Sequence, residues 1–82
     1  MQCFDKICVL IPAYNAQETL GFVLKKIQPF KIDTLVVNDG SSDETKRVAS
    51  ENGAQLLEHS LNLGKGAALQ TGFQYILQKD YQ

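Results

Sequence analysis

The stretch Val36–Thr45 has the sequence VVNDGSSDET, and it joins the three features that decide the fold. The β-branched run Thr34–Val37 is bounded by turn residues, which predicts a short buried strand. Asn38–Gly40 then tolerates turn geometry. Ser42 or Asp43 can accept the free N–H groups of a following helix. The stretch therefore predicts a strand, an acidic turn and a helix, in that order.

Asp39 stands at the end of this predicted strand. In open α/β sheets, ligands bind at the carboxyl ends of the strands, which makes Asp39 a candidate binding residue. An aspartate can equally shape a turn through hydrogen bonds to its own backbone. The local sequence leaves both roles open.

The chain before this stretch has one apolar run and one amphipathic segment. Ile7–Ile11 is continuously apolar, which is typical of a strand covered on both faces, and Pro12 is expected to end it. Apolar residues then recur at helical spacing within Leu20–Ile27. Pro29 should end this helix, because proline lacks the N–H group.

The chain after this stretch repeats the alternation of strand and helix. A short helix is expected over Thr45–Asn52, with Gly53 as its left-handed cap, followed by a strand over Ala54–Glu58. The glycine-bearing turn Asn62–Gly66 precedes a last helix. Four large apolar residues share one face of that helix: Leu69, Phe73, Ile76 and Leu77.

The order βαβαβα predicts an α/β fold, a three-layer open parallel sheet of Rossmann-like type with strand order 3-2-1. The first two helices should cover one face and the third helix the other. The loops Pro12–Glu18, Asn38–Asp43 and Leu61–Gly66 would then lie at the carboxyl edge of the sheet. This placement predicts one candidate site built from three separate loops.

Composition limits the function further. A chain of 82 residues has room for one small domain, and 44% apolar with 21% charged residues is typical of a globular protein. The net charge is −1 and no basic stripe is present, so no nucleic-acid partner is expected. Cys3 and Cys8 lack the spacing of a zinc site and fit a reducing compartment. The first apolar run is too short for a signal peptide or membrane span, so we predict a cytoplasmic location.

The three loops carry groups that suit a nucleotide. Asp39 and Glu18 can accept hydrogen bonds from ribose or base, Tyr14 offers a flat face, and Lys65 with the start of the last helix can meet phosphate. Each residue also has a simpler interpretation. Tyr14 could be a packed loop aromatic, Glu18 a helix-start charge and Lys65 a solvated side chain. The convergence of all three loops favours the binding site.

Other enzyme signatures are absent. A Walker A loop would need glycine at position 59, where His59 stands, and no GxGxxG follows the first strand. His59 is the only histidine, and no GxSxG occurs, so no Ser/His/Asp set can be assembled. We interpret His59 as structural or solvated.

The chain resembles the opening of a family 2 glycosyltransferase of the GT-A fold, close to the polyprenyl-phosphate (dolichol-phosphate) mannosyl- and glucosyltransferases. Three motifs in the family's order carry the resemblance, which spans Ile7 to about Ile76: Val9–Asn15 with Glu18, Val36–Thr45, and Asn62–Ala67 with Gly72.

This resemblance implies a site for a UDP- or GDP-sugar. The complete enzyme would transfer the hexose by inverting displacement to an acceptor such as polyprenyl phosphate. The candidate binding residues, none of them catalytic, are Pro12, Ala13, Tyr14, Glu18, Asn38, Asp39, Gly40 and Lys65.

The family holds Mg²⁺ or Mn²⁺ with a DXD motif on a later strand, and its catalytic base lies further on. Neither is present in this sequence. Residues 1–82 are therefore expected to be the amino-terminal part of such a domain, inactive and without bound metal when isolated. Membrane association of the complete protein stays open.

Two other hypotheses stay open, a nucleotide-binding module without turnover and a structural fragment. The reading frame beyond Gln82 would distinguish them from the enzyme. The strand order also makes the first strand an edge, which predicts that the chain pairs with a second copy there.

Overall fold

A computed structural model describes residues 8–78, which form three strands, three α-helices and one 3₁₀ turn. The alternation of strand and helix is as predicted. In chain order the elements are β1 (Cys8–Ala13), α1 (Gln17–Ile27), η2 (Gln28–Phe30), β2 (Asp33–Asp39), α2 (Thr45–Glu51), β3 (Gln55–His59) and α3 (Lys65–Gln78).

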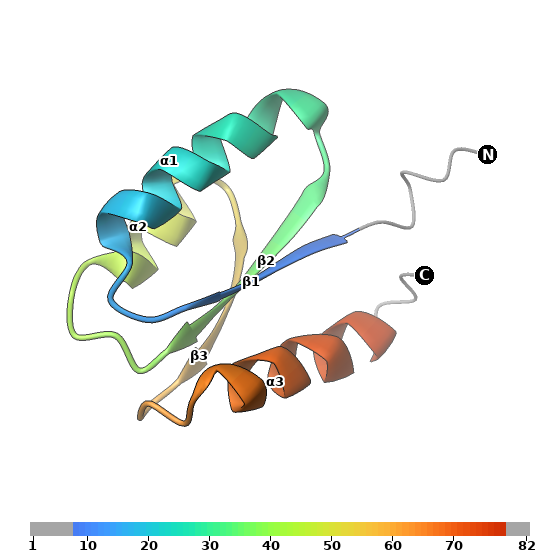
Figure 1. The fold of residues 1–82 in the computed structure, drawn as a ribbon. Helices are drawn as coiled ribbons and strands as arrows, with labels where there is room; N and C mark the ends of the chain where they lie inside the picture. The colour runs from blue at the N-terminus through green and yellow to red at the C-terminus, as the bar shows by residue number, and fades with distance from the viewer. Residues whose placement is uncertain (1–7, 79–82) are drawn as a thin grey trace.

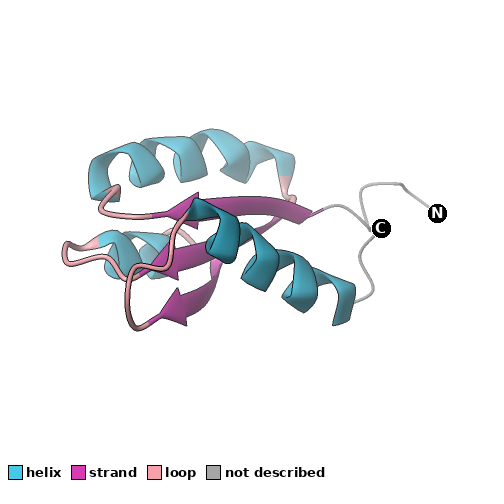
Figure 2. Ribbon diagram, turned by 60° about the horizontal axis from the view of Figure 1, so that its bottom comes forward, coloured by secondary structure: helices cyan, strands magenta, loops and turns pink. Residues whose placement is uncertain are grey.

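The three strands form one parallel sheet with β2 in the centre. Helices α1 and α2 lie together on one face of the sheet, and α3 lies on the other face against β1 and β2 (Figure 1). Figure 2 shows the three strands side by side, with α3 in front of them. The predicted strand order and the predicted side of each helix are confirmed.

The core lies between β2 and the α1–α2 layer. Leu35, Val36 and Val37 of β2 are at most 1% exposed, as expected for a central strand covered on both faces. On the face covered by α1 and α2, Val36 forms a core cluster with Leu20 and Leu24 from the apolar stripe of α1. The positions of these core residues follow from the helical spacing of apolar residues in α1 and from the continuous apolar run in β2.

The strand ends differ from the prediction. Pro12 does not end β1, which continues to Ala13 and pairs with β2 throughout. Within residues 8–78, β1 has a partner strand on one side only, and an edge strand is where a sheet tolerates proline. Ile7 lies outside the described residues.

The prediction that Asn38 and Asp39 form a turn is also wrong, because both belong to β2. They pair with Ala13 and His59 on the neighbouring strands. Strand β3 also begins and ends one residue later than predicted, at Gln55 and His59. Two neighbouring strands supply enough pairing to keep polar residues in extended conformation, which local propensity did not indicate.

Helix α3 contacts the sheet through small residues. Ala68 and Gly72 are its buried positions, whereas Phe73 and Leu77 are 56% and 75% exposed. A Cβ atom at position 72 would overlap the side chain of Leu10 on β1. The shared face of large apolar residues therefore does not set the contact, because close approach to the sheet leaves room only for small side chains.

Helices α1 and α2 end at the predicted signals, whereas α3 begins at Lys65, inside the predicted turn Asn62–Gly66. Helix α1 ends two residues before Pro29, which lies in the 3₁₀ turn η2. Helix α2 ends just before Gly53, whose φ of 78° is in the left-handed region. Between residues 8 and 78, no helix is long and apolar enough to cross a membrane.

Candidate functional site

A pocket of about 370 Å³ lies at the carboxyl edge of the sheet, on the side of α3. It combines the end of β1, the end of β2 and the loop that leads into α3. Its lining residues are Pro12, Ala13, Tyr14, Asp39, Asn62, Gly64, Lys65 and Ala68. Five predicted site residues are among them: Pro12, Ala13, Tyr14, Asp39 and Lys65.

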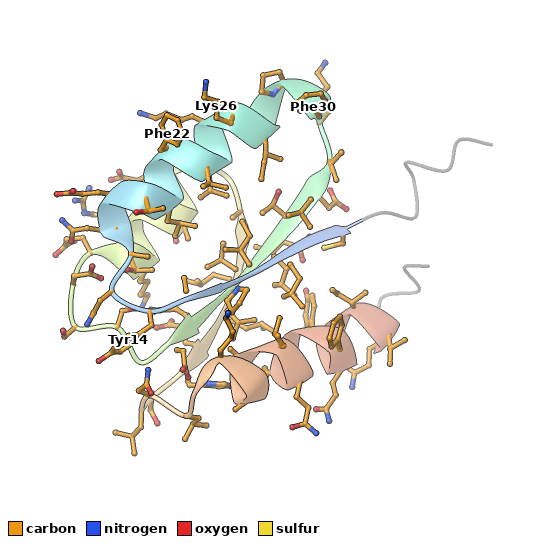
Figure 3. The ribbon with its side chains drawn as sticks, viewed as in Figure 1. Tyr14, Phe22, Lys26 and Phe30 are labelled. Carbon is orange, nitrogen blue, oxygen red and sulfur yellow. The ribbon has the colours of Figure 1, made fainter. Side chains whose placement is uncertain are left out.

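Tyr14 follows β1 directly and lies at the end of the molecule where the loops meet (Figure 3). Its side chain is 53% exposed, although it contributes to the lining of the pocket. The Tyr14 ring is therefore not packed against the loop, as the simpler interpretation would require. An exposed ring at a pocket rim can stack on a flat ligand.

Asp39 is buried at 3% exposure, and its carboxylate holds the loop between β3 and α3. Its Oδ1 accepts the backbone N–H of Leu63 at 2.9 Å, and its Oδ2 accepts that of Gly64 at 2.9 Å. Its backbone carbonyl accepts the side-chain amide of Asn62 at 3.2 Å. The Leu63 N–H first, and then His59, lower the pKa of Asp39, so the carboxyl group is an ionised acceptor at neutral pH.

Three predicted site residues lie outside the pocket lining. The Asn38 side chain faces its own turn, where its Oδ1 accepts the N–H of Ser41 at 3.3 Å. Gly40 has a φ of 73°, and a Cβ there would overlap the backbone of Leu61 and Asn62. Glu18 is exposed in the first turn of α1. Asn38 and Gly40 thus shape the loops around the pocket.

The loops after β1 and β2 bind each other through a set of hydrogen bonds that we call the loop clasp, formed by residues 15–17 and 41–45. The N–H groups of Asn15 and Ala16 are donated to Ser41 Oγ and Thr45 Oγ1, each at 2.9 Å. Gln17 N–H donates to Asp43 Oδ2 at 3.3 Å. Two of the free donors at the start of α1, the N–H groups of Ala16 and Gln17, are therefore satisfied by the other loop.

The clasp is reciprocal. Asn15 Oδ1 accepts the N–H of Ser42 at 2.8 Å, and Gln17 Oε1 accepts that of Glu44 at 2.8 Å. Asp43 Oδ1 accepts the N–H of Thr45 at 2.9 Å and also its hydroxyl, which lowers the pKa of Asp43. As predicted for Ser42 or Asp43, the Asp43 side chain accepts a free N–H group of α2, that of Thr45, although the N-cap position itself is Glu44; Asp43 also accepts the N–H of Gln17 in α1.

Sequence reasoning missed the role of His59. Its ring is 10% exposed, with Nδ1 2.7 Å from Asp39 Oδ1 and Nε2 2.8 Å from the hydroxyl of Thr71. The solvated interpretation is wrong, and the structural one is confirmed. The parallel register places His59 opposite Asp39, a pairing that was visible only once the strand ends were known.

The described residues do not fit a divalent metal. Residues 8–78 contain no group of three or more histidine, cysteine or acidic side chains that could hold one. The Asp39 carboxylate is already engaged by three donors. Cys8 is a free thiol whose pKa is raised by burial first and then by Asp33, and Cys3 lies outside the described residues.

The open parallel sheet with a pocket at its carboxyl edge defines a Rossmann-like α/β protein. Residues 8–81 match the model of the family described as Glycosyl transferase family 2, and the chain belongs to this family. An uncharacterized Methanocaldococcus jannaschii protein, MJ1222, is 39% identical over 75 residues, which are 89% of this chain and 30% of that protein. The 4,4'-diaponeurosporenoate glycosyltransferase of Staphylococcus aureus is 41% identical over 54 residues, 63% of this chain and 14% of that enzyme.

Among solved structures, glucosyl-3-phosphoglycerate synthase from Mycobacterium tuberculosis in complex with UDP is similar, with a TM-score of 0.76 and 28% identity. The match covers 85% of this chain and 29% of that chain. The GT-A fold is therefore confirmed, and the chain spans less than a third of the relatives that it matches.

Proposed function

We propose that this chain is the nucleotide-sugar-binding part of a glycosyltransferase. The whole protein would transfer a hexose from a UDP- or GDP-sugar, by inverting displacement, to an acceptor such as polyprenyl phosphate. The observation that carries the proposal is the pocket in which the ends of β1 and β2 and the start of α3 meet. The family membership and the UDP complex of the similar mycobacterial enzyme support a uridine nucleotide as the first ligand to test.

Each side of the pocket suits one part of such a ligand. The exposed ring of Tyr14 would stack on the base, and an ionised Asp39 would accept a hydrogen bond from ribose or base. Lys65 is the first residue of α3, where free N–H groups and the helix dipole favour phosphate. The proposed order from base to phosphate therefore runs from the β1 end to the α3 end.

Nucleotide titration of the ¹⁵N-labelled chain tests this proposal. UDP should shift amide resonances within residues 12–14 and 61–68, while residues 27–34 at the opposite end of the sheet should stay unchanged. Tyr14→Ala should weaken UDP binding about tenfold, as loss of one aromatic–base stack does. Phe22→Ala, which removes an exposed aromatic from the outer side of α1 (Figure 3), is the matched control.

Lys65→Ala separates phosphate from nucleoside recognition. It should weaken UDP binding by about tenfold and leave uridine binding unchanged, because only UDP carries the diphosphate. Lys25→Ala on α1 is the control. Shifts confined to residues outside the pocket, or equal effects of the Lys65 and Lys25 substitutions, would refute the site.

Residues 8–78 contain no group of three or more histidine, cysteine or acidic side chains that could hold a metal ion, so Mn²⁺ or Mg²⁺ should raise the UDP affinity of the 82-residue chain little. The chain alone should also release no sugar from UDP-glucose. Metal-dependent release that survives repurification would contradict this proposal.

A further inference from the structure

A buried chain of hydrogen bonds joins the ends of β2 and β3 to the middle of α3. Asp39 and His59 are the last residues of their strands and lie opposite each other in the parallel register. The His59 ring bridges Asp39 Oδ1 and the Thr71 hydroxyl, and the side chains of Asp39 and His59 are only 4% and 10% exposed. The side chains of Asp39 and His59, which connect the pocket to α3, are therefore shielded from solvent.

The hydrogen-bond partners of the His59 ring determine which of its nitrogens carries a proton. The ionised Asp39 carboxylate can only accept, so His59 Nδ1 must donate to it. In the neutral ring, Nε2 then accepts the Thr71 hydroxyl proton; in the charged ring, Nε2 donates to the same oxygen. Nδ1 therefore remains a donor to Asp39 in both states.

Three donors together fix the orientation of this carboxylate. Oδ1 accepts two of them, from Leu63 N–H and His59 Nδ1, whereas Oδ2 accepts one, from Gly64 N–H. Because a carboxylate oxygen offers two lone-pair sites, Oδ2 keeps one free acceptor site, and Asp39 is a lining residue of the pocket. Without the His59 bond, only the Leu63 and Gly64 N–H groups would hold the carboxylate, one at each oxygen, and its plane would be less tightly fixed.

We propose that His59 is a positioning residue of the nucleotide site, orienting the Asp39 carboxylate so that Oδ2 accepts a hydrogen bond from the nucleoside. The same carboxylate holds the N–H groups of Leu63 and Gly64, which precede Lys65 at the start of α3. His59 thus acts on both ends of the pocket through Asp39. This inference rests on the proposed function, because it assigns a role toward the same ligand.

Two amide substitutions at position 59 separate positioning from packing. The amide nitrogen of His59→Asn stands near the place of Nδ1 and can still donate to Asp39, but does not reach Thr71. The amide of His59→Gln stands near the place of Nε2 and reaches Thr71 instead. Both remove the imidazole ring, so both should lower the melting temperature to a similar extent.

UDP affinity should divide the two variants. His59→Asn should stay within about threefold of the unmodified chain. His59→Gln should bind UDP at least about tenfold more weakly, the size expected when the Asp39 carboxylate no longer makes its hydrogen bond to the nucleoside. Thr71→Val is the control on the far side of the ring, and it should lower the melting temperature while leaving UDP affinity unchanged. If the Asn and Gln variants lose UDP affinity equally, and the loss follows the drop in melting temperature, the role of His59 is merely structural.

A second measurement keeps this inference separate from the proposed function. The amide resonances of Leu63 and Gly64 report the Asp39 carboxylate directly and need no ligand. They should move in His59→Gln and stay in place in His59→Asn. If the unmodified chain binds no UDP, the proposed function fails, while unchanged amide resonances in His59→Gln would overturn the positioning role itself.

Discussion

Gly40 shows how a single residue controls the approach of two loops. Its φ of 73° and the nearby backbone of Leu61 and Asn62 make two separate demands for glycine. Gly53 has a similar φ of 78°, but a Cβ added there would have no neighbouring atom within 4 Å. The two glycines therefore form a matched pair that separates backbone strain from steric overlap.

We expect Gly53→Ala to lower the free energy of unfolding by about 1 kcal/mol, the cost of a left-handed alanine. Gly40→Ala should cost at least about 3 kcal/mol, because overlap with backbone atoms adds to the same strain. Urea unfolding of both variants measures the difference. Equal costs would show that the loop after β3 moves away from Gly40 easily.

Asp43 gives the clasp a dependence on pH. Its pKa is lowered in the folded chain, mainly by the Thr45 hydroxyl and then by backbone N–H groups, from a usual value of 3.8. The unfolded chain therefore binds this proton first as the pH falls. The stabilising effect of Asp43 is complete above about pH 5 and is lost as the pH falls through the lowered pKa.

The variant Asp43→Asn isolates this effect, because an amide cannot replace an acceptor of three donors. Its melting temperature should lie below that of the unmodified chain at about pH 6, and the gap should shrink toward about pH 3. Asp39 titrates in both proteins, so its contribution cancels. A gap that stays constant over this range would contradict the prediction.

At the scale of elements, the loop clasp replaces the local caps that α1 lacks. The N-cap residue of α1, Ala16, makes no side-chain hydrogen bond that caps the helix. The N–H groups of residues 15–17 are instead accepted by side chains 26–29 positions away in the sequence. Thr45 is central to this arrangement because it is 0% exposed and accepts the N–H of Ala16. The clasp thereby locks the start of α1 to the start of α2.

Thr45→Val keeps the shape of this side chain and removes its hydroxyl. It should lower the free energy of unfolding by about 1–3 kcal/mol, because the N–H of Ala16 and the carboxylate of Asp43 each lose a buried partner. Thr19→Val, at an exposed position of α1, is the control and should change stability little. A similar cost in both variants, measured by urea unfolding, would argue against the clasp.

At the scale of the whole molecule, both outer strands of the sheet, β1 and β3, have an unpaired edge within the described residues, and β3 carries the charged Glu58. Strand β1 pairs with β2 alone, and its segment Cys8–Ala13 carries no charge. Such an edge exposes N–H and C=O groups that can pair with another strand. A second copy of the chain offers the same edge, and pairing of like with like gives a symmetric dimer.

We expect the chain to self-associate through β1 at millimolar concentration. Val9→Lys should shift the chain toward the monomer in sedimentation velocity, whereas Ser50→Lys, at an exposed site of α2, should leave association unchanged. Thermal melts would show whether the charge at the half-buried Val9 also costs stability. A monomeric unmodified chain at this concentration would rule the interface out.

The sequence was enough to predict the class of fold, the strand order, the side of the sheet that each helix covers and the edge where the loops meet. These follow from local periods and from the handedness of parallel connections, which act along the chain. Five of the eight predicted site residues line the pocket for the same reason. Polar residues next to strand ends reach one edge in any such sheet.

The hydrogen-bond partners of those residues become visible in the folded chain alone. The bonds of Asp39 to Leu63 and Gly64, the bridge of His59 to Thr71 and the clasp depend on loops that are distant in sequence. The choice of Ala68 and Gly72 as the covered face of α3 depends on the space beside Leu10. Hydrogen bonds and close packing are set by distances of a few tenths of an ångström between separate elements, and sequence periodicity carries no information at that scale.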